Sequence, residues 1–331
     1  MMTFIIKNNN YYQILFFIII GMKKKLLLSI DGGGIRGIIP LYYLMYLEKE
    51  LIKITGKNIV ETFDMFAGTS VGSMILGTLL FRTYETKNIM SEIIENIFTD
   101  ANFYYIFKDY NYSSIVGLNP KYDSKNKNDL IKKYIKDDVY FNNIGSNKHF
   151  MVPYYSITQE KPIFYKSYKE SKEKHKASDI ICASSSAPIY FSSYVFSDGS
   201  EIGIDGAVFA NNPTDSLYAD ALELYNTTDI RILSLGTGDP ILNPGKPNYY
   251  MGGAIEWITK GSLINIIMDS NQAVVDYKMK IFAKDNDDKY IRIHKPLNVA
   301  LDDLSKIDFL KDEAMKWFVE TKDKVLDLII N

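Results

Sequence analysis

The 331-residue sequence contains very little cysteine, arginine and histidine. Cys182 is its single cysteine, so no disulfide can form within the chain, and a reducing compartment is the easier interpretation. Neither sign of charge dominates, because 38 lysines and arginines stand against 40 aspartates and glutamates, for a formal net charge of −2. We therefore expect no nucleic-acid partner held by a general positive charge.

The N-terminal region lacks an apolar run of the roughly 20 residues that a membrane-spanning helix needs. Residues 11–21 are apolar, but the lysines at 23–25 follow this run, whereas a signal peptide carries its positive charges in front. We interpret residues 1–22 as an extension that is dispensable, with a membrane anchor or an export signal as the alternative. Residues 23–331 are expected to form a single domain with a long C-terminal helix.

Apolar strand patterns alternate with helix patterns along the chain. A buried strand at 26–31 leads into glycines, and leucines spaced by three and four residues then predict a helix that stops at Gly56. A strand at 63–67 and a helix at 71–80 follow. Further strands are expected at 149–158, 162–168, 201–204, 230–235 and 290–293, and further helices at 178–187, 213–225 and 304–330. This order predicts the α/β class, a three-layer α/β/α sandwich around a mostly parallel sheet.

One stretch, residues 102–112, shows no clear period and is interpreted as an insertion or cap. It is rich in aromatic residues, which suit the boundary between membrane and water. One hypothesis is that it forms a lid or a membrane-facing rim, and the alternative is ordinary core packing. The aromatic residues are Phe103, Tyr104, Tyr105, Phe107 and Tyr110.

A candidate nucleophile, Ser70, lies in a G-x-S-x-G pattern with Gly68 and Gly72. The bare pattern is weak, but here it joins an apolar strand to an apolar helix. Such a sharp turn lifts a serine hydroxyl above the sheet, with glycines where side chains would clash. The alternative is a tight turn with an idle serine.

A glycine-rich loop, Asp31–Gly37, follows the first strand and opens a helix. Its glycine spacing also fits a dinucleotide fingerprint, but the acidic residue required about 20 residues later is missing from a strand end, because Glu48 and Glu50 fall inside the helix pattern. Backbone N–H groups at a helix N-terminus can instead form an oxyanion hole. The alternatives for Arg36 are binding of a neighbouring phosphate and an internal salt bridge that fixes the loop.

A serine nucleophile needs a base, and two candidates stand out. His294 ends a strand, and the order Ser70, Asp205, His294 suits a hydrolase triad. Asp205 closes the strand at 201–204, so it is either a turn aspartate or a buried carboxylate that acts as the base alone. Of the other histidines, His149 begins a strand and His175 lies in a lysine-rich stretch that reads as a solvated face.

Several motifs taken together resemble the patatin-like phospholipase family. They are residues 31–37, residues 68–72, the Asp-Gly-Ala-Val-Phe-Ala-Asn-Asn-Pro segment at 205–213, the Ser-Leu-Gly-Thr-Gly segment at 234–238, and the serine-rich segment at 183–191. Each motif is of moderate specificity, whereas their ordered set is highly specific. The resemblance covers about residues 24–297.

This resemblance implies a lipid acyl hydrolase of the phospholipase A type that works through an acyl-enzyme. Ser70 would be the nucleophile and Asp205 the general base, without a metal or another cofactor. The family's oxyanion hole falls on Gly32, Gly33 and Gly34, and its supporting motif positions on Arg36, Gly37, Gly68, Gly72, Gly206 and Ala207.

The resemblance also implies a membrane or micellar lipid substrate and a cytoplasmic or peripheral membrane location. Export as an effector and an activating protein partner both stay open. Residues 285–288 are rich in aspartate but lack the glycine and glutamate of a calcium loop, so they read as a surface turn. The rival functions are a carboxylesterase or thioesterase that uses His294, an inactive lipid-binding module, and a nucleotide-binding protein.

Overall fold

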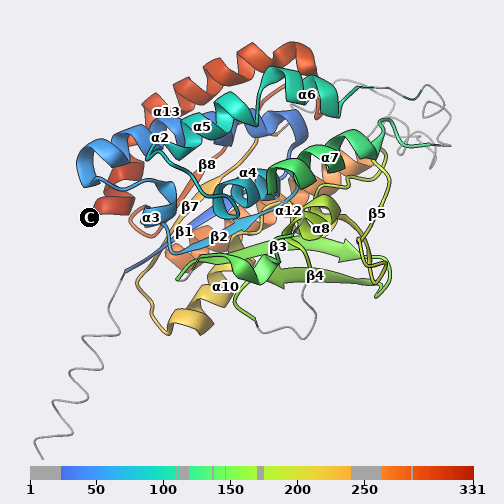
Figure 1. The fold of residues 1–331 in the computed structure, drawn as a ribbon. Coiled ribbons are helices and arrows are strands. Elements are labelled where there is room, and N and C mark those ends of the chain that lie inside the picture. The colour runs from blue at the N-terminus through green and yellow to red at the C-terminus, as the bar shows by residue number, and fades with distance from the viewer. Residues whose placement is uncertain are drawn as a thin grey trace, which may run out of the picture.

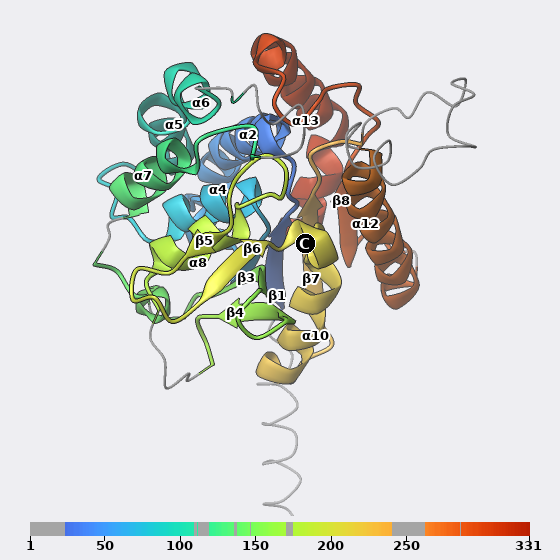
Figure 2. The same cartoon turned by 90° about the vertical axis from the view of Figure 1, so that its right-hand side faces the viewer.

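The structure is a computed structural model and describes residues 24–108, 111, 119–135, 138–145, 147–169, 175–239, 262–284 and 286–331. The expected extension, residues 1–22, lies outside these ranges. The described chain forms one eight-stranded sheet with helices on both faces (Figures 1 and 2). No helix in these ranges has the length and apolar character needed to cross a membrane.

The sheet follows the order β5-β6-β3-β2-β1-β7-β8. In addition, β4 pairs with the edge of β3 opposite to the one that β2 and β6 share. The strands β3, β2, β1, β7 and β8 run parallel to one another. At one side of the sheet, β4, β5 and β6 add antiparallel pairs. The strands are β1 (Lys25–Ile30), β2 (Met65–Gly68), β3 (His149–Ser156), β4 (Lys161–Lys166), β5 (Tyr194–Val195), β6 (Ile202–Asp205), β7 (Ile230–Leu235) and β8 (Tyr290–Ile293). The predicted α/β class with a mostly parallel sheet is confirmed.

Helices cover the two faces unequally (Figure 2). One face carries α2 (Ile38–Thr55), α4 (Val71–Leu80), α8 (Ala177–Ser184) and α13 (Ile307–Ile330), and the other carries α10 (Thr214–Tyr225) and α12 (Ser262–Ala283). The remaining helices are α3 (Ile59–Thr62), α5 (Ile89–Asn96), α6 (Asp100–Ile106), α7 (Ser124–Ile135), α9 (Ala207–Ala210), and the 3₁₀ turns η1 (Gly34–Gly37), η3 (Phe141–Asn143) and η5 (Leu304–Lys306).

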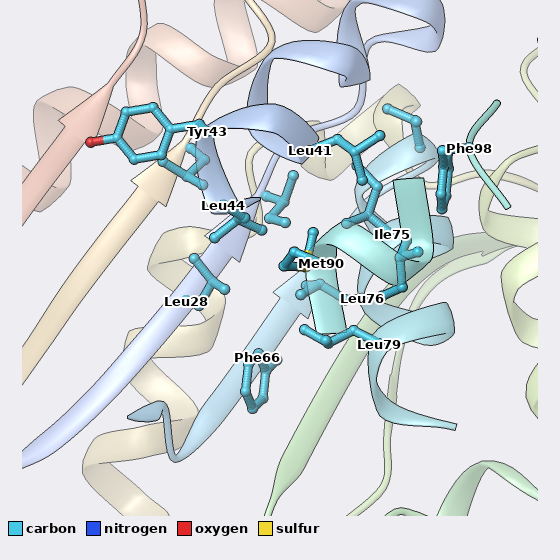
Figure 3. Close-up of a cluster of buried hydrophobic side chains, with 14 of the residues drawn as sticks. Leu28, Leu41, Tyr43, Leu44, Phe66, Ile75, Leu76, Leu79, Met90 and Phe98 are labelled. Carbon is cyan, nitrogen blue, oxygen red and sulfur yellow. The ribbon is translucent and has the colours of Figure 1, made fainter. Parts of the chain in front are cut away.

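The alternation of side chains along β1 divides the core into two parts. Leu28 points into the larger part with α2 and α4, and Leu27 points into the smaller part under α10 and α12. Figure 3 shows Leu28 beside Leu44 of α2 and Phe66 of β2 in the larger part. Because both faces of the central strands are buried, these strands read as continuous apolar runs.

Most predicted elements match the structure, with α4, β7 and β8 at the predicted bounds. The helix α2 ends where predicted, because Gly56 adopts the left-handed conformation with φ 74° that terminates a helix. The predicted hairpin is the antiparallel pair of β3 and β4.

The sequence left one helix unrecognised and placed the end of another wrongly. Part of the aperiodic stretch is the helix α6, which begins because the Thr99 side chain accepts a hydrogen bond from the Asn102 N–H at 3.2 Å. The helix α8 ends at Ser184, whereas the sequence placed its end at residue 187. The hydroxyls of Ser185 and Ser186 bond back to carbonyls of the last turn and compete with helix continuation.

We expect Trp317→Ala to lower the free energy of unfolding by about 3–5 kcal/mol, because a fully buried aromatic side chain would be replaced by a cavity. Trp317 is 1% exposed on α13, which packs along α2. Val319→Ala on the same helix is the control, since Val319 is 66% exposed and its truncation should change stability by less than about 0.5 kcal/mol. Equal losses in denaturant titrations of the two variants would contradict this packing.

Candidate active site

Four segments that the sequence singled out meet at one edge of the sheet. In the parallel register Ile30 lies opposite both Gly68 and Leu235, and Leu235 lies opposite Ile293. The loops that leave β1, β2, β7 and β8 therefore emerge side by side at the carboxyl edge. This is the place where open α/β sheets bind ligands.

The strands β2 and β6 meet end to end along one edge of β3. Met65–Ala67 pairs with the start of β3 in parallel, and Ile202–Asp205 pairs with its end in the opposite direction. The other edge of β3 is occupied by β4, so β2 and β6 share the same edge. Both strands end close to Pro153, and this arrangement brings Ser70 and Asp205 together although 135 residues separate them.

Ser70 occupies a strained turn between β2 and α4. Its backbone has φ 53° and ψ −122°, a conformation that non-glycine residues rarely adopt. The turn closes because Gly68 and Gly72 touch: a Cβ on Gly68 would lie 2.6 Å from the Gly72 carbonyl oxygen. The two glycines of the sequence pattern are thus required by a close backbone approach, as predicted for this type of turn.

The Ser70 hydroxyl donates a hydrogen bond of 2.6 Å to Asp205 Oδ2. Asp205 Oδ1 accepts the Ala207 N–H at 2.8 Å, across the turn at Gly206. Burial raises the pKa of the Asp205 carboxyl to about 6, although the hydrogen bonds from Ser70 and Ala207 and the charge of Lys127 act in the opposite direction. Asp205 is 1% exposed and Ser70 9%, so the contact is largely shielded from water.

The glycine loop after β1 presents backbone N–H groups beside Ser70. The Gly32 N–H is already bonded to the Asn211 carbonyl at 3.1 Å, which removes it from the predicted oxyanion hole. Among the described residues no acceptor is bonded to the N–H groups of Gly33 and Gly34, and both residues line the same cavity as Ser70. Gly34 has φ 56°, a conformation that favours glycine.

A cavity lies above Ser70 and Asp205, and together with the solvent-open space at its mouth it has a volume of about 720 Å³. Its wall combines the glycine loop with apolar and aromatic side chains, which include Phe107, Pro188, Tyr190, Phe191, Ile267, Met268 and Leu301. Such a wall suits an apolar ligand with one polar group near Ser70.

His294, the base of the alternative triad, bonds elsewhere. Its Nε2 lies 2.7 Å from Asp239 Oδ2, and its ring packs against Gly236. No histidine stands between Ser70 and Asp205, because the hydroxyl contacts the carboxylate directly. The prediction that His175 is solvated was wrong: it is 8% exposed and packs between the rings of Tyr165 and Phe196.

Comparison with known proteins gives the family of the chain. The sequence model described as patatin-like phospholipase matches residues 28–218, which include Ser70 and Asp205. The chain belongs to the patatin-like phospholipase family. The predicted resemblance is thereby confirmed.

Curated members of the patatin-like phospholipase family align over most of the chain. Patatin-like protein 3 of Arabidopsis thaliana is 27% identical, with 90% of this chain and 80% of that protein covered. Patatin-like protein 2 of the same plant is 28% identical, with 90% and 82% covered. A cGAMP-activated phospholipase of Vibrio cholerae is 26% identical, with 63% of each chain covered.

The crystal structure of VipD from Legionella pneumophila aligns with a TM-score of 0.40 at 10% identity, over 90% of this chain and 67% of that one.

Arg36 of the family's glycine motif is 2% exposed and so is not presented to solvent. Its Nε lies 3.5 Å from the Gly33 carbonyl oxygen, and the carboxylates of Asp269 and Asp239 are its main electrostatic partners. This position fits a residue that holds the loop better than one that binds an external phosphate. The neighbouring Gly37 lies against Val71, at the start of α4.

A buried ion pair that the sequence did not reveal fixes the start of the glycine loop. Arg292 of β8 contacts both oxygens of Asp31, at 2.6 and 3.3 Å, and also bonds Ser234 and Gln272. Asp31 is fully buried, so its charge depends on this guanidinium. The Thr237 hydroxyl also holds the loop, because it donates a hydrogen bond of 2.7 Å to the Gly32 carbonyl.

The residues considered for other ligands lie in structural positions. Glu48 is buried in α2 and accepts the N–H groups of Ile59 and Met90, so it is not at a ribose position. Residues 286–288 form an exposed turn, whereas Asp285 lies outside the described residues. Within the described ranges, no cluster of three or more histidine, cysteine, aspartate or glutamate side chains is placed to hold a metal ion.

We expect Arg292→Met to lower the free energy of unfolding by about 3–5 kcal/mol, since it leaves Asp31 as a buried charge without its partner. The double variant Arg292→Met, Asp31→Asn should recover much of this loss, because the unpaired charge is then removed. Denaturant titration of the three proteins checks the interpretation. A double variant no more stable than the single one would show that Arg292 acts by some means other than its pairing with Asp31.

Proposed function

We propose that the protein is a lipid acyl hydrolase of the phospholipase A type, with Ser70 as nucleophile and Asp205 as general base. The observation that carries this proposal is the 2.6 Å hydrogen bond from the Ser70 hydroxyl to the buried Asp205 carboxylate at the floor of an apolar cavity. Membership of the patatin-like phospholipase family supports the choice of an acyl ester as substrate. Residues 23–331 are proposed as the unit that folds and carries the site.

The first half of the reaction forms an acyl-enzyme. Ser70 Oγ attacks the ester carbonyl carbon while its proton passes to Asp205 Oδ2. The carbonyl oxygen becomes an oxyanion, which in this proposal accepts hydrogen bonds from the N–H groups of Gly33 and Gly34 in the cavity wall. When the carbon–oxygen bond of the ester breaks, Asp205 returns the proton to the departing alcohol.

The second half reverses these roles with water. A water molecule attacks the acyl carbonyl and Asp205 accepts its proton. As the Ser70 ester bond breaks, Asp205 returns that proton to Ser70 Oγ, and a fatty acid is released. The raised pKa of Asp205, about 6, makes it a stronger base than an exposed aspartate, yet it stays largely ionised at neutral pH. A single carboxylate can therefore serve both halves of the cycle.

The cavity wall supports a fatty acyl chain as the ligand. Phe107, at the end of α6, lines the cavity, whereas Phe103 is buried and Tyr104 is 55% exposed. The aromatic stretch is thus divided between core and surface, and its role as a membrane-facing rim stays a prediction. Tyr110 lies outside the described residues.

The rival functions have less support. A triad would need His294 between Ser70 and the acid, but that ring pairs with Asp239. An inactive lipid-binding module would not need the strained contact of Ser70 with Asp205.

Control by an activator stays a prediction, for which the name of the Vibrio cholerae relative is a precedent. The location, cytoplasmic or peripheral at membranes, is also a proposal, with export as an effector as the alternative.

We expect Ser70→Ala to reduce the release of fatty acid from mixed phospholipid vesicles by roughly four orders of magnitude or more, as loss of the nucleophile does in other serine hydrolases. Asp205→Asn should cause a comparable collapse, because the amide keeps the shape but cannot accept the proton. His294→Ala is the matched control and should keep most of the activity. A folded, inactive His294→Ala beside an active Asp205→Asn would establish the triad instead.

The activity should depend on pH through Asp205. Protonated Asp205 cannot accept the Ser70 proton, so kcat/KM on a soluble short-chain ester should fall about tenfold per pH unit below about pH 6 and level off above pH 7. A soluble ester separates this effect from changes in the lipid surface. A limb centred near the ordinary aspartate value, about 3.9, would contradict a base raised by burial.

A further inference from the structure

A buried lysine, Lys127, lies behind the candidate active site. It belongs to α7 and is 2% exposed. Its Nζ donates to three oxygens of the adjoining α8 region: Cys182 O at 3.2 Å, Ser185 Oγ at 2.9 Å and Ser186 Oγ at 3.4 Å. The side chain therefore crosses from α7 to the C-terminal end of α8, where a positive charge is favourable.

The oxygens around Nζ select the protonated form of Lys127. The Ser185 hydroxyl gives its hydrogen to the Ile181 carbonyl at 2.7 Å, and the Ser186 hydroxyl gives its hydrogen to the Cys182 carbonyl at 2.8 Å. Both hydroxyls are thus left as acceptors towards Nζ. An ammonium group has three hydrogens for three acceptors, whereas a neutral amine would turn a lone pair towards one of them.

Few charged groups act on Lys127 and Asp205. Burial lowers the pKa of Lys127 to about 8, whereas the Cys182 side chain from α8 and Asp205 from β6 act to raise it. The helices α4 and α6, which also pack on α7, bring no described charge to this group. Lys127 is in turn the one charged group among the described residues that acts on Asp205.

The turn that Lys127 holds, residues 184–186, also contacts both members of the Ser70–Asp205 pair. The Ser184 hydroxyl accepts the Ser70 N–H at 3.2 Å and donates to the Pro153 carbonyl at 2.7 Å. The Ser186 carbonyl accepts the Asp205 N–H at 3.0 Å. One turn therefore fixes the backbone of the nucleophile and of the base.

We propose that Lys127 is a positioning residue for the hydrolytic reaction: its ammonium holds the 184–186 turn and supplies the positive charge that keeps Asp205 ionised at neutral pH. This inference rests on the proposed function, since it assigns to Lys127 a role in the use of Asp205 as a base. A buried charge of opposite sign favours the ionised carboxylate, and little water is present to screen it.

The test compares the pH dependence of kcat/KM for wild type and Lys127→Met on a soluble short-chain ester. Methionine keeps an unbranched side chain of similar length and removes the charge. We expect the acid limb to move to higher pH by a fraction of a unit, because the carboxylate loses its positive neighbour while its burial, the main cause of its raised pKa, stays the same. Much of the deficit should disappear at alkaline pH, where Asp205 is ionised in both proteins. A purely structural role would instead lower activity equally at every pH.

Two further variants sharpen this comparison. Lys125→Met is the matched control, because Lys125 lies on the same helix, pairs with Asp129 and has a side chain that is 73% exposed; its acid limb should stay in place. Lys127→Gln also removes the charge but keeps a polar group that can donate to the oxygens around it. It should move the limb in the same direction as Lys127→Met, and it decides the question if Lys127→Met does not fold.

The outcomes separate this inference from the proposed function. Acid limbs of the Lys127→Met and Lys127→Gln variants that coincide with that of wild type, in proteins that need Ser70, would overturn the role of Lys127 and leave the hydrolase intact. Where Lys127→Met does not fold, an unshifted Lys127→Gln limb has the same consequence. Wild-type turnover by a folded Ser70→Ala variant would instead overturn the proposed function itself.

Discussion

The strands β2 and β6 end against the same edge of β3, and the geometry of the site follows from this contact. Each strand stops before it would collide with the other, so the residues after their ends turn towards one another near Pro153. A proline suits this point, because it has no N–H that would need a ladder partner. The sharp turn at Ser70 and the turn at Gly206 complete the approach of hydroxyl and carboxylate.

Around this junction the protein buries two pairs of opposite charges in different ways. Asp31 is neutralised by direct contact with Arg292, a pairing that fixes a loop. Asp205 and Lys127 lie apart, and each is bonded to hydroxyl groups or to backbone polar groups. Under the proposed function this separation matters, because a direct ion pair would strongly depress the basicity of Asp205.

The sequence predicted those features that depend on local rules. Gly56 stops α2, the G-x-S-x-G turn lies at Ser70, and apolar runs mark the parallel strands. Features that depend on distant partners were not predictable: the Gly32 amide is taken by Asn211, and Arg292 reaches Asp31 across 261 residues. The helix α7 was not predicted because most of its residues are polar, and nothing in the local sequence marks Lys127 as buried. The family resemblance indicated Ser70 and Asp205 as candidate site residues, but it did not indicate the neighbouring groups that shift the pKa of Asp205.

The long separation between the two halves of the site affects how the protein is made. Chains are synthesised from the N-terminus, and domains fold as their segments emerge. A ribosome-bound chain that presents Ser70 still lacks β6, β7 and β8, so it has neither the carboxylate nor the arginine that steadies the glycine loop. Under the proposed function, hydrolysis of lipid esters could begin only after β6 has been synthesised and Asp205 can contact Ser70. Products truncated before β6 would hold the nucleophile without its base and would leave lipids intact.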